Sequence, residues 1–243
     1  MAPTARTDGD RVRAQERTYF DAGADRVDRL PYGSHRVCDA LPRLLDLNAV
    51  CVHPGHGVPG DVLEQLDGLQ AHRAFRHVEL PEPIAVPDGW ESDRIVHLAR
   101  RGPAPEPGPD VAEVDRAALH DLRAEWLHGE LPHVADTLLA GDDRLFGATP
   151  TRAWAVLEDG RAVAMALTVG TGDVQMVEDV YTTPSHRGRG LAGQVVRTAT
   201  AAAFAAGAEL VHIPADADGT ERRLYEGLGY REVAVTTRLT RWV

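Results

Sequence analysis

The second half of the chain alternates between two hydrophobic periods. A helix is predicted from Gly190 to Ala206, because apolar side chains recur there every four residues: Leu191, Val195, Ala199 and Ala203. Gly207 follows at the position of a left-handed cap. Further helices are predicted at 115–126, 131–139 and 220–228, and strands at 153–157, 162–169, 173–182, 210–213 and 232–239. Asp159-Gly160 between two apolar runs indicates a β-hairpin. This order predicts a mixed α/β fold.

The first half carries a weak copy of this pattern. Asn48–Pro54 resembles Glu178–Pro184, and the two prolines are 130 positions apart. A helix-like stretch at 61–72 follows, and then come strand-like runs at 75–80 and 94–100, with Gly89-Trp90 in the place of Gly229-Tyr230. The pattern predicts an internal repeat whose first copy is shorter, with no helix before Gly89.

Four prolines and two glycines fall within residues 102–109. Such a segment favours an extended linker over a helix or a central strand. The predicted organisation is therefore a region at 1–101, a linker at 102–110 and a domain at 111–243.

Composition narrows the functional classes. The chain has 243 residues and a net charge of −11, so duplex nucleic acid is a poor partner. All 26 basic residues are arginine, which excludes lysine nucleophiles, Schiff bases and the phosphate loop that ends in Gly-Lys. The polar segment 1–17 lacks the apolar core of a signal peptide, and no apolar run reaches the roughly 20 residues of a membrane span. Two cysteines do not make a disulfide framework, so we expect a cytoplasmic protein with no membrane contact.

The candidate chemistry begins where the strand at 173–182 runs through a glycine-bearing loop into the helix. The loop is Arg187-Gly-Arg-Gly-Leu-Ala-Gly193. Unpaired amides at a helix N-terminus favour an anion, and glycines let a ligand approach the backbone. The pattern favours a diphosphate site over an ordinary strand–helix turn, although the dinucleotide fingerprint is absent.

Two motifs together are similar to those of the GCN5-related N-acetyltransferase (GNAT) superfamily. The first matches its acetyl-CoA motif through Arg187, Gly190 and Ala192. The second is Leu224-Tyr-Glu-Gly-Leu-Gly-Tyr230, which resembles the terminal signature of the family. The resemblance covers residues 111 to 243. It implies a GNAT fold, a splayed mixed sheet flanked by helices, with a second, smaller and degenerate GNAT-like half.

The resemblance also implies roles for individual residues. Acetyl-CoA would lie where two central strands part, with its pantetheine arm on the backbone of Val180, Tyr181 and Thr182. The pyrophosphate would lie on the loop that contains Arg187, Gly188, Arg189, Gly190, Leu191, Ala192 and Gly193. Tyr225 would protonate the departing thiolate, although a packing role is the alternative.

The base that deprotonates the acceptor amine is less sharply defined. Glu178 and Asp179 precede the loop, and strand alternation predicts that only one of them faces the substrate. Relatives with a similar Glu-Asp pair favour the first, so Glu178 is the candidate, against the alternative of a structural ion pair. His212 is a second candidate base, although a lone strand histidine is more often structural.

The sequence departs from the family at Asp218 and Glu221, where acids stand near the expected phosphates; Asp216 and Asp218 could instead cap the helix. In the first copy, the segment equivalent to the loop has no arginine and contains Pro59 and Asp61. We therefore expect no acetyl-CoA site there, and a role in extending the sheet or walling the acceptor pocket. Cys51, His53 and His56 lack a fourth metal ligand, so we expect no metal.

These observations predict an acetyl-CoA-dependent N-acetyltransferase that transfers the acetyl group directly to an amine in a ternary complex. The alternative is a catalytically silent CoA-binding regulatory or scaffolding protein. The acceptor would be a small-molecule or peptide amine, and the protein would be a monomer or a homodimer.

Overall fold

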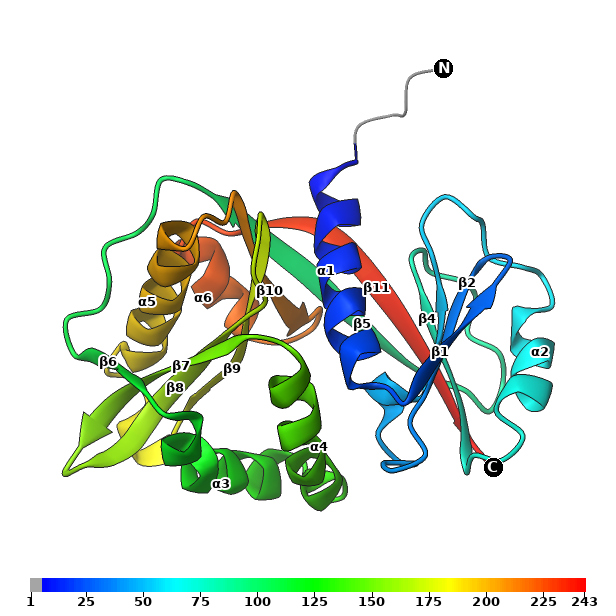
Figure 1. Ribbon diagram of the computed structural model, residues 1–243, viewed down its shortest axis with the longest axis horizontal. Helices are drawn as coiled ribbons and strands as arrows, with labels where there is room; N and C mark the ends of the chain where they lie inside the picture. The colour runs from blue at the N-terminus through cyan, green and yellow to red at the C-terminus, as the bar shows by residue number, and fades with distance from the viewer. Residues whose placement is uncertain (1–5) are drawn as a thin grey trace.

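The fold, described for residues 6–243 of a computed structural model, is one large mixed sheet with helices on both faces (Figure 1). Residues 1–5 of the predicted region 1–101 lie outside this range. The sheet has the strand order β1-β2-β3-β4-β11-β5-β10-β9-β8-β7-β6. The strands are β1 (Arg26–Leu30), β2 (Gly33–Val37), β3 (Val50–Val52), β4 (Phe75–Leu80), β5 (Glu91–Arg101), β6 (Val111–Val114), β7 (Thr151–Glu158), β8 (Arg161–Val169), β9 (Val174–Thr182), β10 (Leu210–Asp216) and β11 (Arg231–Trp242). The α-helices are α1 (Asp8–Gly23), α2 (Val62–Leu69), α3 (His120–Glu130), α4 (Ala135–Ala148), α5 (Leu191–Ala205) and α6 (Glu221–Gly227), with 3-10 turns at Leu45–Leu47, Arg116–Leu119 and Pro184–His186.

The two halves repeat one topology, in agreement with the predicted repeat. In the first half, β1, β2 and β3 are antiparallel, and β3 runs parallel to β4 with α2 between them in sequence. In the second half, β7, β8 and β9 are antiparallel, and β9 runs parallel to β10 with α5 between them. The first half has no helix between β4 and β5 among the described residues, where the second half has α6.

The last strands of the two halves are exchanged. β5 belongs to the first half in sequence but pairs with β10 of the second, from Ile95 to Arg101. β11 ends the chain but pairs with β4 of the first half, from Thr237 to Trp242. The two long strands also pair with each other, and Figure 1 shows them crossing from one half to the other. The first half therefore extends the sheet as expected, and the sheet is continuous across the predicted boundary at residue 101.

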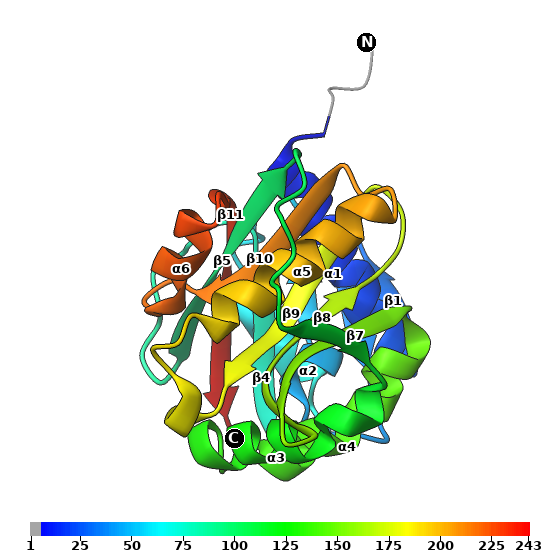
Figure 2. The ribbon, with the colours of Figure 1, turned by 90° about the vertical axis from the view of Figure 1, so that its left-hand side faces the viewer.

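The two faces of the second half are covered by different helices. On β8, Ala164 and Ala166 pack in the cluster under α5, whereas Met165 and Leu167 pack against side chains of α1, α3 and α4. This period-two alternation follows from the pleat of the strand. Figure 2 shows α5 in front of the sheet, with α3 and α4 at its lower end.

The helix α1 was not predicted from the pattern. A capping box begins it: the Thr7 hydroxyl accepts from the Asp10 amide, and the Asp10 carboxylate accepts from the Thr7 amide. The helix then buries Val12, Tyr19 and Phe20. It lies over the middle of the sheet, between the two halves (Figure 1). The helix α1 is therefore part of the core.

The segment 102–110 forms the connection between β5 and β6 and docks on α5. The Gly108 amide donates to Thr198 Oγ1 at 2.9 Å. A Cβ at Gly108 would lie 2.5 Å from Gln194 Cβ, so only glycine permits this approach. The proline-rich segment thus has a fixed place against the helix that follows the glycine loop.

Candidate active site

A cleft opens where the parallel pair β9 and β10 separates. The two strands pair only from Val174 to Met176 and from Leu210 to His212. β9 then continues to Thr182 and β10 to Asp216 without further pairing between them. The cleft beside this split has a volume of about 1000 Å³, which is at the upper end of the range for ligand sites.

A β-bulge lies at the floor of the cleft. In the β8–β9 register, Met165 faces Tyr181 and Leu167 faces Glu178, so two residues of β9 oppose one residue of β8. The two residues are Asp179 and Val180, which oppose Ala166, and Asp179 has φ 54°. The bulge breaks the alternation of side chains, and both Glu178 and Asp179 line the cleft. The expectation that the pair would point to opposite faces was wrong for this reason.

The two carboxylates have different surroundings. Asp179 forms an ion pair with Arg123, which also donates to Asp142 at 2.7 Å. Glu178 Oε2 is buried with no hydrogen-bond partner among the described residues. Burial raises the pKa of Glu178 to about 7, although the positive charge of Arg123 opposes the shift. Glu178 can therefore exchange a proton near neutral pH, while Asp179 is held as the partner of an arginine.

The glycine loop forms another wall of the cleft. Gly188 and Gly190 both have φ 77°, and a Cβ at either position would meet no atom within 4 Å. Gly190 is the N-cap of α5, and no side chain caps this helix. The first amides of α5 therefore have neither intrahelical nor side-chain acceptors, as an anion site requires.

The two arginines of the loop differ in position. Arg187 lines the cleft, where its Nη2 donates to Glu130 at 2.7 Å and its Nε donates to the Thr182 carbonyl at 3.1 Å. Arg189 does not line the cleft. Its Nη2 lies 2.5 Å from Glu158 Oε1, so it anchors the loop to the β7–β8 hairpin. The other predicted cofactor residues line the cleft: Val180, Tyr181, Thr182, Gly188, Gly190, Leu191, Ala192 and Gly193.

Tyr225 lies on α6 across the cleft and is 5% exposed. Burial and the nearby charge of Glu221 raise its pKa above the usual value of a phenol. The hydroxyl therefore stays protonated at neutral pH and can act as an acid. The structure brings Tyr225 and Glu178 into one cleft, although the two residues are 47 positions apart in sequence.

His212, the second candidate base, lies outside this cleft. It is fully buried on β10, and its Nε2 lies 2.7 Å from Gln15 Oε1 on α1. Burial lowers its pKa well below the usual value, with the nearby His97 adding to the shift. The side chain joins α1 to the sheet. Asp216 and Asp218 do not cap α6 either: the N-cap is Thr220, and Asp216 Oδ1 accepts from the Asp218 amide at 2.9 Å.

Residues far away in sequence also line the cleft. Sequence reasoning missed Glu16, Tyr19 and Phe20 on α1, Asp46 after β2, Arg123 on α3 and Arg238 on β11. The capping box and the spacing of Val12, Glu16, Tyr19 and Phe20 were the available signals for α1. The exchange of β5 and β11, which places Arg238 in the cleft, has no such signal in the sequence.

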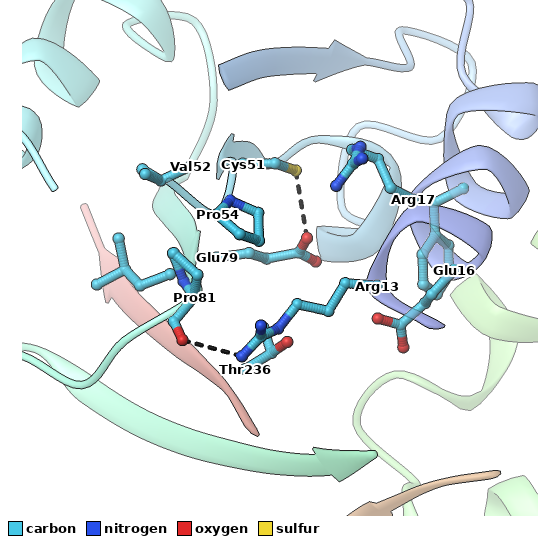
Figure 3. A pocket seen from close by; sticks show the side chains of 11 residues that line it. Arg13, Glu16, Arg17, Cys51, Val52, Pro54, Glu79, Pro81 and Thr236 are labelled. Carbon is cyan, nitrogen blue, oxygen red and sulfur yellow. Dashed lines mark hydrogen bonds between the residues drawn. The ribbon is translucent and has the colours of Figure 1, made fainter. Parts of the chain in front are cut away.

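The equivalent position in the first half holds a much smaller cavity. Its volume is about 30 Å³, and it lies beside Cys51, Glu79 and Arg13 (Figure 3). Cys51 Sγ donates to Glu79 at 3.2 Å and accepts from Arg36 at 2.7 Å. The helix α2 has only eight residues, and Asp61 stands at its N-cap. Within residues 6–243, no three His, Cys, Asp or Glu side chains come together as metal ligands.

Comparisons with known proteins agree with this geometry. Residues 113–230 match the acetyltransferase (GNAT) family. The fold is similar to a GCN5-related N-acetyltransferase from Kribbella flavida, at 23% identity and a TM-score of 0.69, with 98% of this chain and 96% of the other covered. It is also similar to a putative GNAT acetyltransferase from Novosphingobium aromaticivorans, at 21% identity and a TM-score of 0.58, with 95% and 98% covered. A tandem GNAT protein from the clavulanic acid biosynthesis pathway aligns at 12% identity and a TM-score of 0.56, with 87% and 79% covered. No curated protein matches the sequence.

The segment 113–230 is thus a GNAT acetyltransferase domain, and the chain has the GNAT fold. The resemblance carried by Arg187, Gly190 and Leu224–Tyr230 is confirmed. Among the described residues, no helix has the length and apolar character of a membrane span.

Proposed function

We propose that the protein is an acetyl-CoA-dependent N-acetyltransferase that acts on a small-molecule amine. The observation that carries this proposal is one cleft in which an uncapped helix N-terminus, a buried Glu178 without a paired cation and a protonated Tyr225 face a common space. These groups supply the anion site, the base and the acid that thioester aminolysis requires.

The cleft offers polar groups both for the pyrophosphate and for the pantetheine arm of acetyl-CoA. The amides that follow Gly190 would accept the pyrophosphate, because no protein group competes for them. The edge of β9 from Val180 to Thr182 is unpaired toward β10 and offers backbone groups to the amides of the pantetheine arm. Arg187 would exchange its contact with Glu130 for a phosphate.

The chemistry divides between Glu178 and Tyr225. Glu178 accepts a proton from the ammonium of the acceptor, and the neutral nitrogen attacks the thioester carbonyl. The carbon–nitrogen bond forms, the carbon–sulfur bond breaks, and Tyr225 donates a proton to the sulfur. The second proton lost from nitrogen restores Tyr225. The products are an N-acetyl amine, CoA with a free thiol and one released proton.

A catalytically silent CoA-binding protein is the second candidate. Glu221 lines the cleft close enough to Tyr225 to affect its pKa, and this acid departs from the family pattern. A negative charge there opposes a phosphate-bearing ligand. Turnover of an amine separates the two candidates, since both bind CoA.

Calorimetric titration with acetyl-CoA tests the site, with Gly190→Asp as the variant. We expect micromolar affinity and one site per chain, with binding weakened at least about tenfold in the variant because the carboxylate occupies the anion site. Gly57→Asp is the matched control: Gly57 has φ 69° and open space around its Cβ position, but it precedes α2 in the first half. Equal affinity in both variants, or no binding by the wild type, would overturn the proposal.

A further inference from the structure

The helix α1 places a second buried carboxylate without a paired cation in the cleft, that of Glu16. Glu16 is 9% exposed, and its carboxylate makes no hydrogen bond to any residue in the range 6–243. Its nearest ionisable contact is His97 Nε2 at 3.7 Å. Burial lowers the pKa of His97 to about 3, so this imidazole is neutral and does not balance the carboxylate.

Two neighbouring arginines, Arg238 and Arg13, have other partners. Arg238 lies 3.3 Å from Asp46 and 3.9 Å from Glu79. Arg13 donates to the backbone carbonyls of Pro81 and Val235. Figure 3 shows the Arg13 guanidinium turned toward Pro81, and no dashed line reaches Glu16.

Besides the more exposed acids Asp216 and Glu221, the cleft therefore contains two deeply buried carboxylates, Glu16 and Glu178, without a paired cation. Glu178 lies on β9 at the split of the strands. Glu16 lines this cleft and also the small cavity of the first half, so it lies on the side toward the first half. Tyr19, Phe20, Leu145 and Phe146 supply apolar wall around this end. A ligand that complements it has an apolar body and positive charge at two points.

We propose that the acceptor amine carries a second cationic group, and that Glu16 is the specificity-determining residue that binds it. This inference rests on the proposed function, since it assigns the acceptor of the same cleft. Glu178 takes the reacting ammonium, and Glu16 takes the second ammonium or guanidinium. Burial and the negative charges of Glu79 and Glu178 raise the pKa of Glu16 to about 8, against the opposing charges of Arg238 and Arg36. A bound cation relieves this electrostatic cost, whereas an uncharged end of an alkyl chain does not.

The test compares α,ω-diamines of three to six carbons with n-alkylamines of the same length. Calorimetric titration at pH 7.5 measures the affinity of each amine for the wild type and for Glu16→Gln. We expect the best diamine to bind the wild type about tenfold more tightly than its matched monoamine, and Glu16→Gln to remove most of that difference while leaving the monoamine unchanged. Glu64→Gln is the charge-matched control, because Glu64 is exposed on α2 and lines neither cavity.

The outcomes also separate this inference from the proposed function. Equal affinity for diamine and monoamine, or an unchanged preference in Glu16→Gln, overturns the role of Glu16 even when acetyl-CoA binds. Absence of acetyl-CoA binding together with a Glu16-dependent diamine preference overturns the transferase and keeps the cation site. In an active enzyme, we expect Glu16→Gln to raise KM for the diamine about tenfold with little change in kcat, which a merely structural role would not do.

Discussion

The burial of the Glu16 carboxylate predicts how the stability of the protein depends on pH, and this prediction does not depend on any ligand. An acid whose pKa is raised in the folded state keeps its proton there at a pH at which the unfolded chain has lost it. For Glu16 the folded pKa is about 8, against 4.5 for an unperturbed glutamate. The stability contribution of this group is therefore fully present below pH 4.5 and is lost as the pH rises to 8.

The size of the effect follows from the two pKa values. Each unit of pH between them changes the free energy of unfolding by about 1.4 kcal/mol. Between pH 5 and pH 8 the wild type should lose about 4 kcal/mol relative to Glu16→Gln, which has no proton to lose. The glutamine is nearly isosteric and removes no hydrogen bond, because Glu16 makes none with the described residues.

Urea unfolding of both proteins at pH 5 and pH 8 measures this difference directly. The contributions of the other titrating groups to the free energy of unfolding cancel in the comparison, since both proteins contain these groups. Glu64→Gln should follow the wild type at both values of pH, because Glu64 is exposed. Parallel pH profiles for wild type and Glu16→Gln would refute the reasoning, since they would mean that water or a conformational change hydrates Glu16.

Three further predictions address the reaction and the packing of the site. Tyr225→Phe should lower kcat about 100-fold and leave the calorimetric affinity for acetyl-CoA unchanged, because only the proton donor is lost. The value of kcat/KM should rise with pH through an ionisation near pH 7, as Glu178 loses its proton, and this limb should be absent from the pH profile of Glu178→Gln. Gly108→Ala should lower the free energy of unfolding by about 1–3 kcal/mol, because its Cβ would lie 2.5 Å from Gln194 Cβ. Gly129→Ala, in α3 with open space around its Cβ position, should not be destabilising in the same urea titration.

The local pattern of the chain determined the elements of the second half. Four-residue spacing predicted α5 within a residue of its bounds, and Asp159-Gly160 predicted the β7–β8 hairpin, where both residues have positive φ. The glycine loop and Tyr225 could also be identified from the sequence, because their motifs are contiguous. Short-range features of this kind depend on propensity and hydrogen bonding within a few residues.

Sequence alone did not show how Glu178 and Asp179 point. Strand alternation holds only for regular pairing, and whether a bulge forms is decided by the register between β8 and β9. Arg123 on α3, the ion-pair partner of Asp179, lies 55 residues before Glu178 in the sequence, and Tyr19 on α1, a neighbour of Glu178, lies 159 residues before it. The choice between the two acids therefore depended on tertiary contacts.

The tertiary structure likewise decided which elements of the first half line the cleft of the second half. The sequence shows two similar segments and a proline-rich connection, and these suggest two neighbouring units. It contains no sign that β5 and β11 change places, because the pairing of these strands joins segments that lie far apart in the sequence. This exchange and the packing of α1 over the sheet bring Arg238 and Glu16 to the cleft of the second half. The motifs thus predicted where a donor would bind, while the long-range packing of the chain determined the shape and charge of the rest of the cleft.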